Sequence, residues 1–181
     1  AFFVMLLNFS KINIPMFEEV AAGIKDEIGT GVPTVTPTQK MKIDVQDVVY
    51  SMQADEAVNV GTDDQGVVIE LASSAFYKPG SADIRPDAFP VLQKMAQTLD
   101  SPRYQTYVIE IEGHTDDDPI HTARYPSNWE LSAGRASGVV RLFIEYGMDG
   151  TRMKATGFAE TRPKVPHTLL PLCVWTLSLR R

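Results

Sequence analysis

The residues most able to do chemistry lie in two short segments of the sequence. Segment 112–120 reads Glu-Gly-His-Thr-Asp-Asp-Asp-Pro-Ile, and segment 128–136 reads Asn-Trp-Glu-Leu-Ser-Ala-Gly-Arg-Ala. An imidazole and several carboxylates can bind a metal ion, whereas a carboxylate and a guanidinium can together hold a ligand with one positive and one negative group. The residue types leave three interpretations open: a metal or hydrolytic site, a solvated acidic turn, or a site for a zwitterionic ligand.

A metal or hydrolytic site would use His114 together with Asp116, Asp117 and Asp118. Against it, the chain has three histidines, no second ligand motif, and no nucleophile at a recognisable spacing from a base. We therefore predict no catalytic residue, no metal and no cofactor. Taken in isolation, the three aspartates are also well explained as a turn exposed to water.

A zwitterion site would use Asp116 and Arg135. Arg135 falls in the first half of a predicted helix, where the helix dipole disfavours a cation, so local electrostatics does not explain its position. A guanidinium can hold a carboxylate through two parallel hydrogen bonds, and Asp116 could hold an ammonium group. Together they match the amino-acid end of diaminopimelate in a peptidoglycan stem peptide.

The elements predicted around these residues are those of an α+β domain. Alternating apolar residues predict strands at 67–71, 107–112 and 153–157. One helix is predicted with Asp87 as its N-cap, and a second begins at the capping-box pattern of segment 127–130, Ser-Asn-Trp-Glu. The order β-α-β-α-β predicts helices packed on a small mixed sheet.

The remaining segments divide the chain further. Residues 1–14 begin with an apolar run too short to cross a bilayer, which needs about 20 residues, so it is either a buried helix or half of a transmembrane helix. Residues 15–28 predict an amphipathic helix. Residues 29–58 predict a Gly/Thr/Pro-rich linker and then a short helix over 40–58. We place the compact domain at 59–166 and treat 167–181 as an atypical tail, either a last strand or an unnatural end that leaves that strand missing.

Composition excludes some classes of function. The net charge is −6 and the isoelectric point is about 5.0, which argues against a nucleic-acid partner because phosphate binding needs a basic face. The single cysteine, Cys173, allows no disulfide within the chain.

Several of these segments together resemble the OmpA-like peptidoglycan-binding family. The resemblance rests on Gly-His-Thr-Asp at 113–116, on Asn-x-x-Leu-Ser-x-x-Arg-Ala at 128–136, and on the loops at 76–84 and 157–163, and it covers about residues 60–166. It implies that Asp116 and Arg135 clasp diaminopimelate and that Thr115 and Asn128 shape the pocket. The other predicted binding residues of this signature are Leu131 and Ser132.

Within that family, the insert at 118–129 resembles the flagellar stator branch of the MotB/PomB type. This resemblance implies a homodimeric, single-pass protein of the bacterial inner membrane with its C-terminal domain in the periplasm, joined to a MotA/PomA-type channel subunit and anchored to the cell wall. It further implies that 1–14 is the C-terminal half of a transmembrane helix and that 15–28 is a plug-like helix. The alternative is an OmpA/Pal-type structural tether without a motor role.

Overall fold

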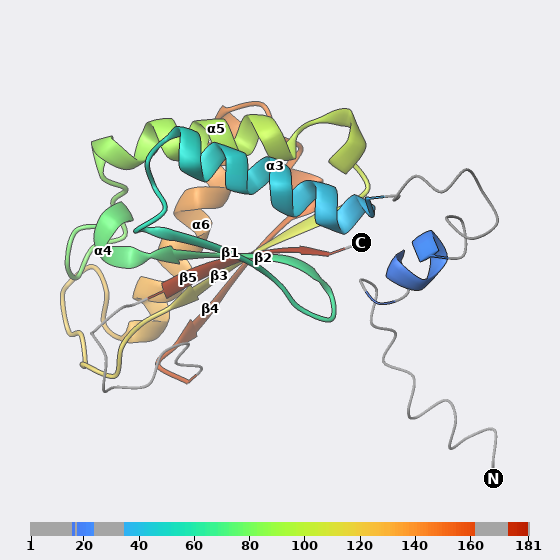
Figure 1. Cartoon of the computed structure of the whole chain (residues 1–181). Coiled ribbons are helices and arrows are strands. Elements are labelled where there is room, and N and C mark those ends of the chain that lie inside the picture. Colours follow the sequence, from blue (N-terminus) through green and yellow to red (C-terminus); the bar gives the residue numbers. More distant parts are fainter. Residues whose placement is uncertain (1–15, 17, 24–34, 162–173, 181) are drawn as a thin grey trace, which may run out of the picture.

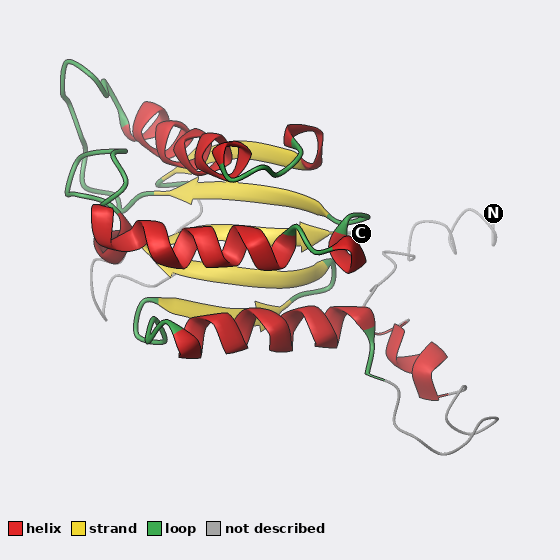
Figure 2. Cartoon of the chain, turned by 90° about the horizontal axis from the view of Figure 1, so that it is seen from above, coloured by secondary structure: helices red, strands yellow, loops and turns green. Residues whose placement is uncertain are grey.

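A five-stranded mixed sheet carries the longer helices on one of its faces (Figures 1 and 2). The computed structural model describes residues 16, 18–23, 35–161 and 174–180. The strands are β1 (Val58–Thr62), β2 (Gly66–Ala72), β3 (Val108–His114), β4 (Met153–Ala159) and β5 (Val174–Arg180), and the helices of the domain are α3 (Pro37–Ser51), α4 (Ser73–Phe76), α5 (Phe89–Leu99) and α6 (Asn128–Glu145). The predicted α+β class, with helices on a small mixed sheet, is confirmed.

The carboxyl ends of β2, β3 and β4 lie at the same end of the sheet, because these three strands run in the same direction. The strand order is β1-β2-β5-β3-β4, and only β3 and β4 among these neighbours pair in parallel. Because β2 and β3 are both antiparallel to β5, they run in the same direction as each other. The segments that follow β2 and β3 therefore leave the sheet on the same side, at the left of Figure 1.

Strand β5 lies at the centre of the sheet, between β2 and β3. Leu177 and Leu179 are fully buried in the hydrophobic core, and Ile69 and Ile111 lie on either side of Leu177. Of the two interpretations of segment 167–181, the strand is the one found. Alternation of Leu177 and Leu179 with polar Thr176 and Ser178 is the pattern that a half-apolar strand requires.

The segment before the predicted domain differs from expectation. We predicted a linker and a helix over 40–58, but α3 begins at Pro37 behind a capping box formed by Thr36 and Gln39, and β1 begins at Val58. Pro37 stands in the first turn, where its fixed φ favours a helix. The apolar face of α3 is buried in the common core through Met41, Val45, Val48 and Val49. Segment 36–62 is therefore part of the folded domain.

The two other helix starts were predicted with different success. The capping box at Ser127 and Glu130 is present, so the predicted start of α6 is confirmed. The predicted N-cap at Asp87 is wrong: a 3₁₀ turn over Pro86–Ala88 precedes α5, and the N-cap residue Ala88 makes no side-chain bond. Two prolines close together, Pro86 and Pro90, allow this tight turn to lead directly into the helix.

The N-terminal predictions lie mostly beyond the described residues. The predicted half of a transmembrane helix at 1–14 and the linker at 29–34 fall outside them, as does Cys173. Of the predicted plug-like helix, residues 16 and 18–23 are described and helical. The Glu18 carboxylate accepts a hydrogen bond from the backbone N–H of Thr38 in the first turn of α3 (3.3 Å). None of the described helices is long and apolar enough to span a membrane.

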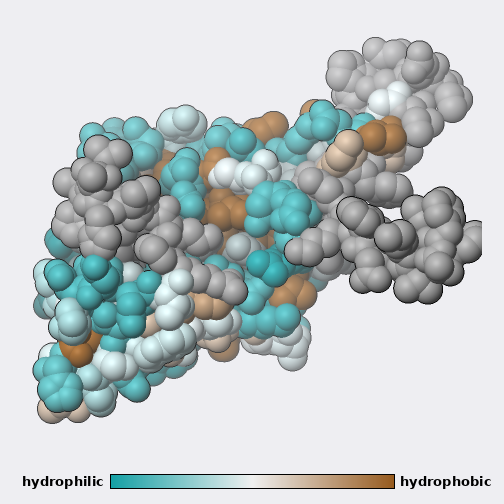
Figure 3. Space-filling model, turned by 90° about the horizontal axis from the view of Figure 1, so that it is seen from below, coloured by the Kyte–Doolittle hydropathy of each residue, from teal (hydrophilic) through white to brown (hydrophobic). Residues whose placement is uncertain are grey.

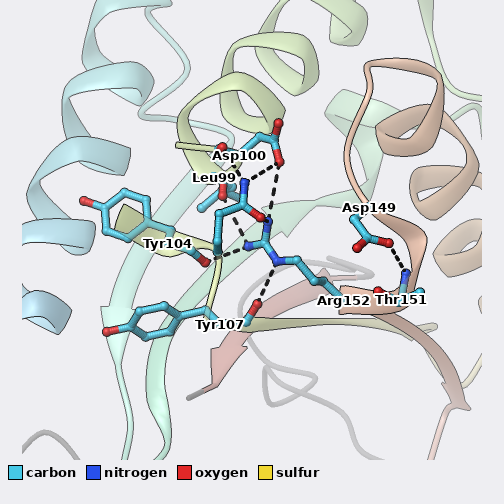
Figure 4. Close-up of polar contacts among 8 residues, drawn as sticks. Leu99, Asp100, Tyr104, Tyr107, Asp149, Thr151 and Arg152 are labelled. Atoms are coloured by element: carbon cyan, nitrogen blue, oxygen red, sulfur yellow. Dashed lines mark hydrogen bonds and ion pairs between the residues drawn. The ribbon is translucent and has the colours of Figure 1, made fainter. Parts of the chain in front are cut away.

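Arg152, just before β4, ties three parts of the chain together from a nearly buried position (Figure 4). Its guanidinium donates to the carbonyl oxygens of Tyr104 (2.7 Å), Tyr107 (3.2 Å) and Leu99 (3.4 Å), to Gln105 Oε1 (2.8 Å) and to the Asp100 carboxylate (3.5 Å). These acceptors belong to the end of α5 and to the connection that leads into β3. One side chain thus fixes the entry to the strand that precedes the acidic loop.

We expect Arg152→Met to lower the free energy of unfolding by about 3 kcal/mol, because several buried carbonyl oxygens lose their donor while the apolar stem is kept. Urea unfolding followed by circular dichroism measures the change. Arg141→Met, at an exposed position of α6, is the matched control and should change stability little. Equal stability of the two variants would contradict the role of Arg152.

Asp44 holds α3 against the turn that follows α5. Its carboxylate accepts from Tyr104 Oη (2.6 Å) and pairs with Lys40 (2.7 Å) and Arg103 (3.3 Å). Burial of the Asp44 carboxyl raises its pKa, but the hydrogen bonds from Lys40 and Tyr104 and the charges of Lys40 and Arg103 outweigh burial, so the pKa lies below its usual value. Folding therefore favours the ionised form of Asp44 over the protonated form.

This lowered pKa predicts a pH-dependent contribution to stability. Since the pKa of Asp44 is lower in the folded chain, its contribution is present above the unfolded value of about 4 and is lost as the pH falls through the folded value. Asp44→Asn should thus be less stable than the original chain at pH 7, and the difference should narrow towards pH 3. Asp47→Asn, at an exposed position of the same helix, controls for the change in helix charge. A difference that stays constant with pH would contradict the prediction.

Candidate ligand-binding cleft

The candidate site lies where β2 and β3 end. Ala72 pairs with Val174 of β5, and Gly113 pairs with Trp175, so the two strand ends flank the same end of β5. At about 5 Å between neighbouring strands, the ends of β2 and β3 are roughly 10 Å apart. The chain leaves β2 into the short helix α4 and leaves β3 into the acidic loop at 115–120, and a cleft opens between them.

The cleft has a volume of about 420 Å³ and three walls. One wall is formed by α4 and the loop at 77–80 with Arg85, another by the acidic loop, and the third by the first turns of α6. Four of the six predicted binding residues line it: Asp116, Asn128, Leu131 and Arg135. The acidic loop after β3 and the start of α6 therefore meet the loop at 77–80, which is distant from both in sequence, at one concave surface.

The guanidinium of Arg135 is held in a fixed orientation inside this cleft. Arg135 is 4% exposed, its Nε donates to the carbonyl oxygen of Ser81 (2.9 Å), and its guanidinium lies over the ring of Tyr77, 5.1 Å from the centroid. Its Nη1 makes no hydrogen bond to the described part of the chain. Nη1 can therefore still donate a hydrogen bond, and leaving a buried donor unpaired costs free energy.

Tyr77 contacts Arg135 in two ways, through its hydroxyl and through its ring. Its buried hydroxyl donates to the carbonyl oxygen of Arg135 (3.1 Å), while its ring forms the surface beneath the guanidinium. Burial raises the pKa of Tyr77 far above its usual value, and the charge of Arg135 opposes this rise only in part. The phenol therefore stays neutral and remains a donor over the whole physiological pH range.

Asn128 positions the acidic loop. Its side-chain amide donates to the carbonyl oxygens of Asp116 (3.3 Å) and Asp118 (3.1 Å), and the residue is the first of α6. The resemblance implied that Asn128 shapes the pocket. The geometry gives a physical means for this, because one amide fixes the backbone that carries Asp116.

The two other predicted residues, Thr115 and Ser132, are buried and do not line the cleft. The backbone N–H of Thr115 donates to the carbonyl oxygen of Ala159, and the Ser132 hydroxyl accepts from the backbone N–H of Ala159. Thr115 thus links the acidic loop, and Ser132 links α6, to the last residue of β4 by a hydrogen bond.

Sequence reasoning missed Tyr77, Ser73, Lys78 and Arg85, which also line the cleft. Tyr77 and Lys78 lie in the loop pattern at 76–84, which was their only signal, whereas Ser73 and Arg85 lie outside that pattern. Tyr77 and Arg135 are far apart along the chain, so their stacking depends on the tertiary fold and not on spacing.

Two glycines allow α6 to approach the sheet closely. Gly113 and Gly157 are paired residues of β3 and β4. A Cβ on Gly113 would clash with the carbonyl oxygen of Ser132, and a Cβ on Gly157 would lie 2.7 Å from the backbone nitrogen of Ala133. The glycine pair therefore sets the depth at which α6 presents Asn128 and Arg135.

We expect Gly113→Ala to destabilise the domain by about 1–3 kcal/mol, because backbone cannot move aside as a flexible side chain can. Gly61→Ala is the control, since a Cβ on Gly61 of β1 would meet no atom within 4 Å. Thermal unfolding of both variants measures the difference. A Gly113 variant as stable as the Gly61 variant would show that the close approach is not required.

His114 is buried and does not line the cleft. Its ring stacks on Phe158 with centroids 5.4 Å apart, and Nε2 is 3.5 Å from a Glu112 oxygen. In the part of the chain that the structure describes, no three His, Cys, Asp or Glu side chains come together in a way that could hold a metal ion. The side chain of His114 therefore packs in the interior of the domain and does not line the cleft with Asp116.

Comparison with known proteins places this fold and cleft in a family. Residues 76–170, more than half of the chain and including the cleft-forming loops, match the OmpA family. The chain belongs to the OmpA family. The uncharacterized protein YtxE of Bacillus subtilis is 31% identical across 90% of this chain and 73% of its own length. Motility protein B of Helicobacter pylori strain J99 is 30% identical across 59% of this chain, which spans 42% of that protein.

Solved structures with the OmpA-like fold agree with these relatives. A MotB-like protein from Desulfovibrio vulgaris superposes with a TM-score of 0.70 and 25% identity, covering 80% of this chain and 94% of its own. The cell wall anchor of the T6SS from Pseudomonas aeruginosa superposes with a TM-score of 0.65 and 25% identity, covering 76% and 97%. The chain is a MotB-like protein with an OmpA-like domain.

Proposed function

We propose that the cleft binds the diaminopimelate group of peptidoglycan stem peptides. The observation that carries this proposal is Arg135, whose guanidinium is nearly buried, stacked on Tyr77, and oriented by Ser81, with Nη1 left without a partner among the described residues. A carboxylate entering the cleft can accept from this guanidinium. Such a charge-assisted bond is strong where water is excluded.

Asp116 supplies the opposite charge on the facing wall. The Asp116 side chain is half-buried and lines the same cleft as Arg135, and its backbone is fixed by Asn128. An amino-acid group carries an ammonium and a carboxylate on one carbon, so it can contact both residues at once. Leu131 provides an apolar contact for the methylene chain of the ligand.

The function that follows is binding without catalysis, with the cell wall as the partner. One relative is named motility protein B, and one structural neighbour is described as a cell wall anchor. On this basis the chain is a peptidoglycan-binding subunit that anchors a flagellar motor stator, with its domain in the periplasm, a MotA/PomA-type channel subunit as partner, and a homodimer as its assembled form. Asp116, Arg135, Asn128 and Leu131 are its proposed ligand-binding residues, and Thr115 and Ser132 are proposed to position the walls of the cleft through Ala159.

An OmpA/Pal-type tether without a motor role is the second candidate, since peptidoglycan-associated lipoproteins are also among the relatives. The sequence upstream of residue 1 distinguishes the two. A complete membrane-spanning helix with a single acidic residue supports the stator, whereas a lipidation signal or barrel strands support the tether. The plug-like role of residues 15–28 belongs to the stator proposal alone.

We expect Arg135→Ala to weaken binding to purified peptidoglycan sacculi about ten- to a hundredfold, because a charge-assisted contact of roughly 1.5–3 kcal/mol is lost. Co-sedimentation with sacculi over a range of protein concentrations measures the affinity. Arg141→Ala, on the exposed face of the same helix, should bind like the original chain.

Because Arg135 is buried, its replacement can also disturb folding, so a second variant is needed. Asp116→Asn, at a more exposed position with nearly the same volume, should weaken binding while thermal unfolding stays unchanged. Full retention of both the Arg135 and the Asp116 variants on sacculi would rule out the proposed site.

A further inference from the structure

The cleft holds more positive groups than a single zwitterion needs. Besides Arg135, the side chains of Lys78 and Arg85 line it, and both are contributed by the wall that faces the acidic loop. Lys78 is exposed, and the Arg85 side chain is 43% exposed. A ligand with one carboxylate would use Arg135 and leave these two cations without a partner in the ligand.

The contacts that Arg85 already makes are long. Its Nη1 is 3.5 Å from the carbonyl oxygen of Ser74, and its Nη2 is 3.6 Å from an oxygen of Asp87, whose side chain is exposed. Good hydrogen bonds between nitrogen and oxygen are about 2.7–3.2 Å long. The guanidinium therefore has donor capacity left for an anion in the cleft.

A neighbouring hydroxyl points to the same conclusion independently. Ser73, next to Ser74 in the chain, lines the cleft, is 4% exposed, and its Oγ makes no hydrogen bond within the described residues. Hydroxyl groups in such surroundings normally have a partner, because a buried unpaired donor is costly. An anion beside Arg85 would give the Ser73 hydroxyl an acceptor.

We propose that Arg85, with Lys78 and the Ser73 hydroxyl, forms a second anion subsite that holds another free carboxylate of the same ligand. This inference rests on the proposed function. Diaminopimelate has two amino-acid centres, and its second carboxylate is free only when the stem peptide ends at that residue. The cleft therefore selects stems that end in diaminopimelate over stems in which this carboxylate is bonded to a further residue.

The test uses the full chain and two synthetic peptides. One is L-alanyl-γ-D-glutamyl-meso-diaminopimelate with its terminal carboxylate free, and the other carries a carboxamide at that position only. Isothermal titration calorimetry at low ionic strength gives the ratio of their dissociation constants. We expect the free acid to bind about tenfold more tightly, as a charge-assisted contact replaces a neutral one.

Variants locate the preference in the structure. Arg85→Gln should bring the ratio close to one, whereas Arg124→Gln should keep it, because Arg124 pairs with Asp83 and does not line the cleft. Equal binding of both peptides by the original chain would overturn the second subsite and leave the proposed function standing. A ratio unchanged by Arg85→Gln would likewise overturn it. If neither peptide binds, the proposed function and the subsite are overturned together.

Discussion

The pairing of β5 with both β2 and β3 is the interaction on which the rest of the domain depends. Without it, the sheet consists of two separate pairs, β1 with β2 and β3 with β4, that share no hydrogen bonds. Two of the three walls of the cleft belong to different pairs, since α4 follows β2 and the acidic loop follows β3. A backbone ladder through β5 thus sets the width of the binding site, although the described side chains of β5, at 176–180, do not line it.

The arrangement around Arg135 shows how a fold prepares a charged group for binding. The guanidinium contacts Tyr77 and Ser81, both from the segment that directly follows α4. These contacts remove rotamer freedom before any ligand arrives, so less entropy is lost on binding. The glycine pair at 113 and 157 contributes at the level of the backbone, because it sets the distance of α6 from the sheet.

Patterns local in sequence could be predicted, and contacts across the fold could not. The strand at 67–71 and the capping box at Ser127 were correct because alternation and capping depend on neighbouring residues. The start of α3 was missed because Thr36 and Pro37, which begin a helix, also suit a linker. Asp116 and Arg135 were singled out by charge and family pattern, whereas the contribution of Tyr77 arises only when β2 and α6 come together.

The position of β5 in the chain has a consequence for how the protein is made. Every other described element precedes β5 in sequence, yet β5 pairs with the middle of the sheet. While the chain is being synthesised, β2 and β3 each present an unpaired edge with apolar residues on one side. Such edges are prone to associate with other chains. Formation of the complete sheet therefore waits for β5, and a chain that ends before β5 keeps these edges exposed to chaperones and proteases.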